Sequence, residues 1–237
     1  MKKKILISYI FAILFAMACK KDDPKYYATT NLNVVNAAVG AGGIKVNSGI
    51  SSGFLWSKTA SVAYGASALY GATPETHTII VVPASDTTKV LFNKTFKMQP
   101  INTLYFAGQY PNIDTLFRVE HNLPVVSVGA VPDDSMYIRF VNLSPNSPSL
   151  SINLKAVTSK EINALDYKSI SEFKKYSALA TTSNYVFEVR NATTNLILTS
   201  FTVNVSNNRY RTLALVIKGL VGASGADALS VFQVSYI

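Results

Sequence analysis

Two short stretches, Val34-Val35-Asn36-Ala37 and Phe140-Val141-Asn142-Leu143, have the same order of residue types and lie 106 residues apart (142 − 36). Self-similarity at a fixed separation is the sequence signature of a repeated structural unit. The pattern predicts two similar domains of about one hundred residues each, an ordinary domain size. Three further pairs match in the same order and at nearly the same separation: Tyr64 with Tyr167, Ile79–Val82 with Val186–Val189, and Thr103–Phe106 with Thr212–Leu215.

Both copies consist mainly of short β-branched and aromatic runs separated by turn signals, which is typical of strands. We therefore expect an all-β chain with two tandem immunoglobulin-like antiparallel β-sandwich domains, over residues 29–130 and 131–237. Residues 159–176 are richer in Lys, Glu and Ser, and predict a short helix or a crossover loop. The clearest predicted strands are residues 31–36, 76–82, 90–92, 185–190, 196–198, 201–205, 213–217 and 229–234.

The first 18 residues have the organisation of an export signal, with Lys2–Lys4, an apolar run over Ile5–Phe15 and small residues before Cys19. The apolar run is shorter than the roughly 20 residues that a membrane-spanning helix needs. Ala16-Met17-Ala18-Cys19 resembles the lipobox of bacterial lipoproteins, and Cys19 is the one cysteine of the chain. The resemblance implies a lipoprotein signal peptide over residues 1–18, lipid attachment at Cys19 and a tether over residues 19–28. The alternative is an ordinary cleaved signal followed by an incidental cysteine.

The polar stretch after Cys19 bears on where the anchor would place the protein. Lys21-Asp22-Asp23 resembles the signals that send some Bacteroidetes lipoproteins to the outer face of the outer membrane. A plain linker of a periplasm-facing lipoprotein fits the same residues. We therefore expect a protein anchored to the outer membrane by its lipid, on either the periplasmic or the cell-surface face.

The composition excludes a disordered chain, because 49% of the 237 residues are hydrophobic and 15% are charged. Removal of Lys2–Lys4 with the signal would lower the net charge from +9 to +6, and the remainder is spread over both halves. Because the sequence contains no basic stripe, we expect its charges to lie solvated on exposed strand faces, and we expect no nucleic-acid partner. The scattered arginines behind this expectation are Arg139, Arg190, Arg209 and Arg211.

The stretch Val141–Ile152 resembles the opening of the family called domain of unknown function 4397, in which Val-Asn-Ala-Ser-Pro precedes alternating apolar residues. Val35–Asn47 is a weaker copy that lacks both prolines, and Val62–Tyr70 resembles the next element of the family. The second half has Tyr167-Lys168 where the family has Gly. The resemblance covers roughly residues 30–237 and implies tandem, lipid-anchored β-sandwiches in Bacteroidetes, with no established activity or catalytic residues.

The sequence marks no catalytic site, so we expect a non-enzymatic protein without cofactor or metal. His77 lies inside a strand-like run, His121 follows the first half, and no Ser stands in a nucleophile elbow. Asp133-Asp134 could contribute oxygen ligands to Ca²⁺, although a solvated hinge fits these residues better. An envelope hydrolase that uses an unmarked pair of carboxylates is the alternative.

Binding residues are suggested by Gly53-Phe54-Leu55-Trp56-Ser57, which places two large aromatics beside small residues. Exposed rings of this kind stack on sugars or dock onto proteins, so a glycan or an envelope protein is the expected partner. The alternative is that Phe54 and Trp56 point the same way along a strand and fill the first core. The oligomeric state is open.

Three stretches resemble the Asp-Ser/Thr-apolar sites that are O-glycosylated in exported Bacteroidetes proteins. The candidate attachment residues are Thr87, Thr115 and Ser135, each directly after an Asp. All three are predicted at turns or element ends, where a bulky glycan has room.

Overall fold

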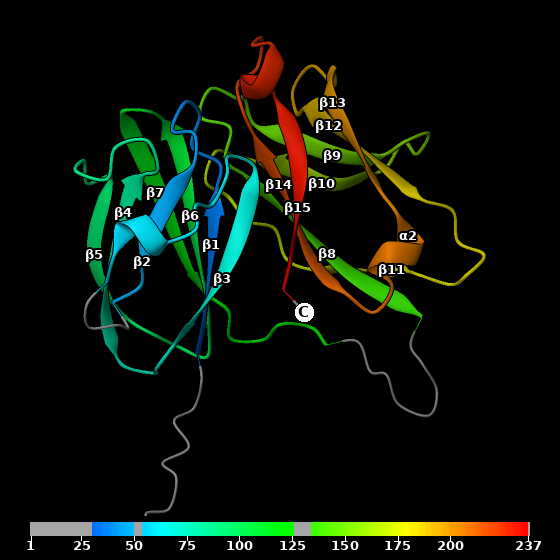
Figure 1. The fold of residues 1–237 in the computed structure, drawn as a ribbon. Helices are drawn as coiled ribbons and strands as arrows, with labels where there is room; N and C mark the ends of the chain where they lie inside the picture. The colour runs from blue at the N-terminus through cyan, green and yellow to red at the C-terminus, as the bar shows by residue number, and fades with distance from the viewer. Residues whose placement is uncertain (1–29, 50–53, 126–133, 237) are drawn as a thin grey trace, which may run out of the picture.

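The computed structural model describes residues 30–49, 54–125 and 134–236. The described residues form β-sheets with a few short helical turns, which confirms the all-β sandwich fold (Figure 1). The predicted boundary between residues 130 and 131 lies outside the described residues, and the domain limits therefore stay a prediction. We refer below to residues 30–125 and 134–236 as the first and second halves.

Each half contains an inner sheet, which faces the other half, and an outer sheet. In the first half the inner sheet has the order β3 (Ala66–Ala72), β1 (Thr30–Asn36), β6 (Ile101–Gln109), β7 (Asn112–Val119). Its outer sheet has the order β2 (Ile44–Asn47), β4 (Thr76–Pro83), β5 (Phe92–Lys97). A 3₁₀ turn, η1 (Trp56–Lys58), lies in the connection between β2 and β3.

The second half repeats this arrangement with one additional strand. Its inner sheet has the order β11 (Lys174–Ser177), β8 (Ser135–Asn142), β14 (Thr212–Lys218), β15 (Ser230–Ser235). Its outer sheet has the order β10 (Lys160–Leu165), β9 (Leu150–Leu154), β12 (Tyr185–Asn191), β13 (Ile197–Val203). The short elements α2 (Val205–Asn208) and η2 (Gly225–Asp227) lie in the connections before and after β14.

The pairing differs from the purely antiparallel arrangement expected from the sequence. β1 lies parallel to β6, and β8 lies parallel to β14, whereas the other described strand pairs are antiparallel. A parallel pair needs a long crossover connection, and here the chain crosses to the outer sheet and back between the two strands. The repeat is visible in this pairing, because Val34 lies beside Leu104 and Phe140 beside Leu215. In this register Thr103 of β6 corresponds to Ala214 of β14, which lies two residues after the predicted partner, Thr212.

Three apolar cores hold the four sheets together. One core fills each sandwich, and a third joins the two inner sheets. Successive side chains of a strand point to opposite faces, so on β14 Leu213 and Leu215 enter the second core while Ala214 and Val216 enter the core between the halves. Burial on both faces explains why Leu213–Ile217 is a continuous apolar run instead of an alternating one.

The repeated asparagines occupy equivalent places at the ends of β1 and β8. Asn36 donates from Nδ2 to the carbonyl oxygens of Gly42 and Val62 at 2.8 and 3.1 Å, and its Oδ1 accepts the backbone N–H of Ala38. Asn142 donates to the carbonyl of Leu165 at 3.0 Å, and its Oδ1 accepts the N–H of Ser144 at 3.0 Å. Both side chains are fully buried, so each fixes the connection that carries the chain to the outer sheet.

Most predicted strands are confirmed, with shifts of a few residues at some ends. The prediction for residues 159–176 is wrong in part, because the segment contains no helix and contributes β10 and β11, which lie at the edges of the two sheets. Residues 166–173 between these strands cross from the outer to the inner sheet, as the alternative of a crossover loop predicts. Two irregularities interrupt the pairing of β10 with β9, which removes the regular alternation that would mark a strand. The runs 196–198 and 201–205 form the single strand β13, after which Asn204 caps α2 through the N–H of Asn207.

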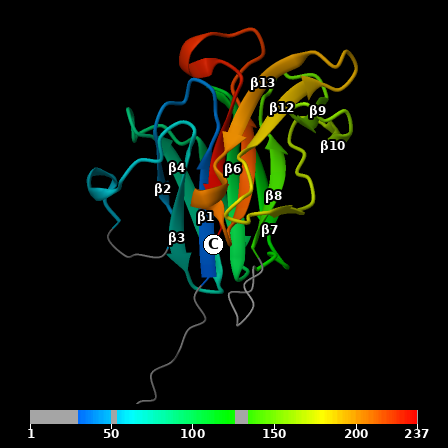
Figure 2. The same ribbon diagram turned by 90° about the vertical axis from the view of Figure 1, so that its right-hand side faces the viewer.

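The two ends of the molecule carry different connections between strands. β1 begins at the lower end of the body in both Figures 1 and 2, and we call this end the base. The connections β3–β4, β5–β6, β11–β12 and β13–β14 lie at the base, as the strand directions require. The opposite, distal end carries η2 and the β12–β13 connection.

Candidate functional site

The predicted lipid attachment residue, Cys19, lies outside the described residues, as do the signal and the tether. Within residues 30–49, 54–125 and 134–236, no helix has the length and apolar character needed to cross a membrane. The first described residue, Thr30, begins β1 at the base.

The predicted aromatic pair lies on the surface of the first half, in a loop. Phe54 precedes η1 and Trp56 begins it, and both are half-buried. Their rings meet edge to face, with centroids 4.7 Å apart and planes at 82°. Leu55, between them, is 54% exposed. The alternative, in which both rings lie on a strand and fill the first core, is therefore wrong, because neither residue is in a strand or a buried core cluster.

The loop that carries these rings is fixed to the outer sheet. Lys45 on β2 donates from Nζ to the carbonyl oxygen of Trp56 at 2.7 Å, and Thr59 donates from Oγ1 to that of Leu55 at 3.0 Å. We call residues Phe54, Leu55 and Trp56 the aromatic loop. Because the rings are held in place before a partner arrives, ordering them costs little on binding.

The three candidate glycosylation residues have different surroundings. Thr87 lies in the β4–β5 turn and is half-buried, while the preceding Asp86 accepts hydrogen bonds from Thr88. Thr115 lies in the middle of β7 and not at a turn as predicted. Ser135 is only 2% exposed, so the prediction of a glycan there is wrong for the folded chain, because β8 begins in the core at that residue.

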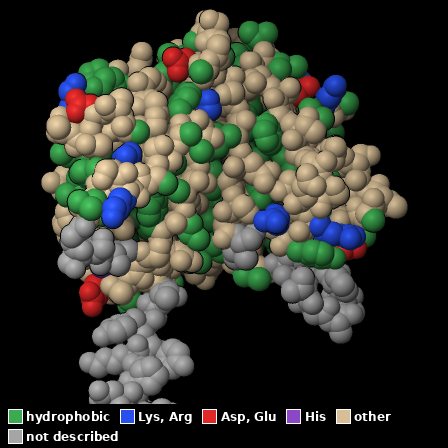
Figure 3. Space-filling model, in the orientation of Figure 1, with side chains coloured by type: hydrophobic (Ala, Val, Ile, Leu, Met, Phe, Trp, Pro, Cys, Tyr) green, Lys and Arg blue, Asp and Glu red, His purple; other side chains and the backbone are tan. Residues whose placement is uncertain are grey.

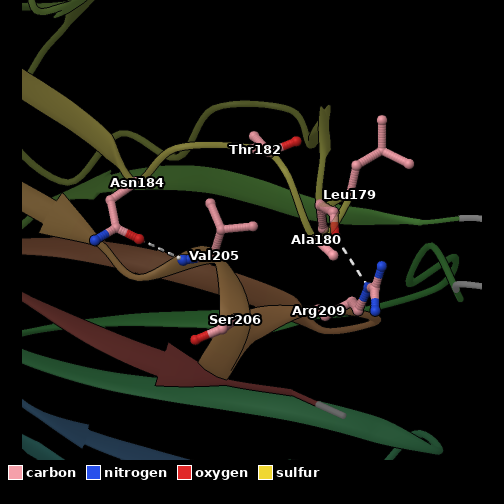
Figure 4. A pocket seen from close by; sticks show the side chains of 8 residues that line it. Leu179, Ala180, Thr182, Asn184, Val205, Ser206 and Arg209 are labelled. Carbon is pink, nitrogen blue, oxygen red and sulfur yellow. Dashed lines mark hydrogen bonds between the residues drawn. The ribbon is translucent and has the colours of Figure 1, made fainter.

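A hollow of about 240 Å³ opens at the base of the second half, between residues 178–184 and α2 (Figure 4). Arg209 donates from Nε to the carbonyl oxygen of Ala178 at 3.0 Å, and Asn184 accepts the N–H of Val205 at 3.1 Å. These bonds join the two walls. Thr182, Ser206 and Arg209 contribute polar groups to the lining, and Leu179 is 50% exposed beside them.

Two further hollows lie elsewhere on the described surface. One, of about 260 Å³ at the distal end, is lined by apolar residues such as Ile197, Leu220 and Leu229. The other, of about 560 Å³ at the base of the first half, includes Gln99, Glu120 and His121. Glu120 is itself buried and bound to Arg139.

The sequence does not predict the buried surroundings of Arg139. Predicted as a solvated charge, it is 2% exposed and forms a two-pronged ion pair with Glu120, with Nη1 donating at 2.9 Å. It also donates to the hydroxyls of Tyr105, at 3.1 Å, and Tyr236. Phe173 covers one side of the guanidinium at 4.7 Å.

The ionisation of this cluster follows from its burial. Burial is the largest single effect and acts to lower the pKa of Arg139, but the hydrogen bonds to Glu120, together with the electrostatic effects of Tyr105, Tyr236 and Glu120, outweigh it and the pKa is raised. Burial also raises the pKa of Tyr105 well above its ordinary value, and raises that of Tyr236. The cluster therefore consists of one charge pair and two neutral phenols, which suits a structural clamp between the halves.

The remaining titratable candidates have structural partners. His77 is buried on β4, where its Nε2 lies 3.0 Å from Thr73 Oγ1. Asp133 lies outside the described residues. Asp134 accepts a hydrogen bond from Tyr210 at 2.5 Å and forms an ion pair with Arg209 at 2.9 Å. The described residues contain no cluster of three or more His, Cys, Asp or Glu side chains that could hold a metal ion.

Comparison with known proteins leaves the family open. No family model matches the chain, so the resemblance to domain of unknown function 4397 stays a prediction. No curated protein matches it significantly. Among solved structures, a "putative adhesin" from Bacteroides ovatus aligns over 93% of this chain and 98% of its own, at 11% identity and a TM-score of 0.25. A TM-score this low supports no conclusion about fold or function.

Proposed function

We propose that this protein is a non-enzymatic, lipid-anchored binding module of the outer membrane, in which the aromatic loop contacts a glycan. The observation that carries the proposal is the pair Phe54 and Trp56, held edge to face on the surface next to the exposed Leu55. Aromatic faces combined with neighbouring polar groups bind sugar rings. The fixed loop and the body formed by two joined sandwiches would present these rings without large rearrangement.

The aromatic loop is tested by measuring the binding of purified residues 20–237 to an array of polysaccharides. We expect retention of at least one glycan class, and loss of most of that binding in Trp56→Ala. Tyr110→Ala is a matched control, because Tyr110 is another aromatic residue at the surface, 37% exposed, in the β6–β7 connection. Binding that survives Trp56→Ala, or that falls equally in Tyr110→Ala, would sink this assignment.

The anchor is tested by fractionating cells that express the full chain. Cys19→Ala should move the protein from the membrane fraction to the soluble fraction, since the acyl chains would be lost. Retention of Cys19→Ala in the membrane would contradict the anchor while leaving the glycan assignment intact.

The hydrolase alternative requires two carboxylates about 5 to 9 Å apart across an accessible cleft. Among the three hollows described above, Glu120 is the one carboxylate in the lining, and Arg139 neutralises it. Because this carboxylate is already paired with Arg139, the lining of these hollows favours the binding function over the hydrolase.

A further inference from the structure

We propose that the base of the second half docks directly onto the anionic phospholipid headgroups of the membrane that carries the protein. The surface concerned consists of Leu179, Arg209, Arg211 and the hollow that Figure 4 shows, and we call it the basal patch. The inference rests on the proposed anchor for its orientation, but it concerns a separate surface and a separate ligand.

The distribution of arginine is the first argument. Three of the five arginines, Arg118, Arg209 and Arg211, lie at the base, whereas Arg139 is buried and Arg190 lies near the distal end of β12. Arginine presents a planar fork of donors that matches phosphate oxygens, and it is preferred over lysine where phosphate is bound in a defined geometry.

The balance of charge at the base is the second argument. The described basal loops and strand ends carry the cations Lys97, Arg118, Arg209 and Arg211 against the two acids Glu75 and Asp134. The buried Glu120 pairs with Arg139 and also lies 3.8 Å from the Arg118 guanidinium, so Arg118 contributes less to this balance than the other cations. Asp134 forms an ion pair with Arg209, which leaves the exposed Arg211 as the stronger attraction for an anion. Figure 3 shows Lys and Arg side chains beside hydrophobic ones along the lower edge of this half.

The hollow provides both polar and apolar contacts. Figure 4 shows Leu179 directed away from the body near Arg209, with Thr182 and Ser206 on the two walls. Its volume of about 240 Å³ is several times the roughly 30 Å³ that one water occupies, so it has room for a phosphate group. An exposed leucine beside phosphate-binding donors is what the boundary between headgroups and acyl chains accommodates.

The place where the described chain begins indicates that the membrane surface is the ligand of the basal patch. The described chain begins at Thr30, at the base, and the ten residues between Cys19 and Thr30 can span at most about 35 Å. If Cys19 carries lipid, the base is held close to the bilayer surface, where the local concentration of headgroups is very high. The distal hollow, in contrast, lies at the opposite end of the molecule from Thr30.

The proposal is tested by sedimenting un-acylated residues 20–237 with vesicles. We expect binding to vesicles of equal parts phosphatidylcholine and phosphatidylglycerol, weaker binding at 0.5 M salt, and little binding to phosphatidylcholine alone. Arg211→Gln should weaken the affinity about fivefold, and Leu179→Asp about tenfold. Leu196→Asp is the matched control, because Leu196 is also an exposed leucine, 64%, but lies at the distal end. It should change the affinity less than twofold.

Equal binding to neutral and anionic vesicles, no binding to either, or an equal loss in Leu196→Asp would overturn the proposal. Thermal unfolding of each variant checks that the fold is kept, which the exposure of all three side chains favours. Because the assay omits Cys19 and does not use the aromatic loop, its failure is distinguishable from failure of the proposed function.

Discussion

The two buried asparagines show how a single residue type specifies the same turn twice. Asn36 and Asn142 each end the first strand of a half, donate to a buried backbone carbonyl further along the chain, and accept the N–H two residues on. No other neutral side chain of this size offers both two donors and an acceptor, apart from the longer glutamine. The repeated Val-Asn pattern in the sequence therefore reflects a shared structural requirement.

We expect Asn36→Ala and Asn142→Ala each to lower the free energy of unfolding by about 2–3 kcal/mol, because buried carbonyls lose their donors. Asn47→Ala is the control, since Asn47 makes a similar bond to the N–H of Gly49 at 2.9 Å but at an exposed site. Urea unfolding measures the difference. Equal losses in all three variants would contradict this role for the repeated asparagines.

The buried phenols give the protein a stability limit at alkaline pH. Burial and the nearby Asp227 raise the pKa of Tyr64 to about 12, and burial raises that of Tyr167 to about 12. A raised folded-state pKa contributes stability that is present below the unfolded value of about 10 and is lost as the pH rises towards the folded value. Stability should therefore fall between pH 10 and 12.

Tyr64→Phe tests this linkage, because its hydroxyl lacks a hydrogen-bond partner in the described structure and its removal should be nearly neutral at pH 7. Urea unfolding at pH 7, 9 and 11 should show a smaller alkaline loss in the variant than in the parent. An identical pH dependence for both proteins would refute the assignment to Tyr64.

At the scale of elements, the sequence predicts strands well where burial on one or both faces imposes a pattern. The β-branched run Thr76–Val82 becomes β4, and Leu213–Ile217 lies within β14. The sequence fails to predict β10 and β11, which lie at sheet edges and carry exposed lysines, and the pairing of β10 is also irregular. It also cannot show the parallel pairings or the burial of Arg139, because both depend on which segments meet after folding. For the site, it locates the aromatic loop but not the basal patch.

The β14–β15 connection contains two glycines that should respond differently to substitution. A Cβ on Gly219 would lie 2.2 Å from the carbonyl oxygen of Ala228, whereas one on Gly222 would meet nothing within 4 Å. Both have positive φ, which costs about 1–2 kcal/mol for alanine. Gly219→Ala should therefore destabilise the protein clearly more than Gly222→Ala in thermal unfolding. Equal effects would show that the turn relaxes freely.

At the scale of the whole molecule, the two halves share an apolar core and a buried ion pair. Val35, Tyr105, Val141 and Val216 are fully buried between the inner sheets, and Arg139 reaches Glu120 of the first half. Interfaces inside one chain allow relative motion unless they are large and hydrophobic. This apolar interface favours a single body in which the aromatic loop and the base keep fixed positions.

Breaking the ion pair should therefore affect both halves at once. Glu120→Gln leaves the Arg139 charge buried with a weaker partner, and we expect a loss of about 3–5 kcal/mol in a single cooperative transition. Lys89→Met, which removes the exposed partner of Asp86, should cost less than about 1 kcal/mol. Calorimetry would contradict the account if the parent protein unfolded in two separate transitions.

The central claim is that the aromatic loop is the binding site, and the fluorescence of Trp56 tests it most directly. Trp56 is the one tryptophan of the chain, so its emission reports on this loop alone. During titration with a glycan retained on the array, we expect the emission to shift to shorter wavelength and to saturate, as the ring leaves water. A glycan that binds the protein while the Trp56 emission stays unchanged would contradict the account.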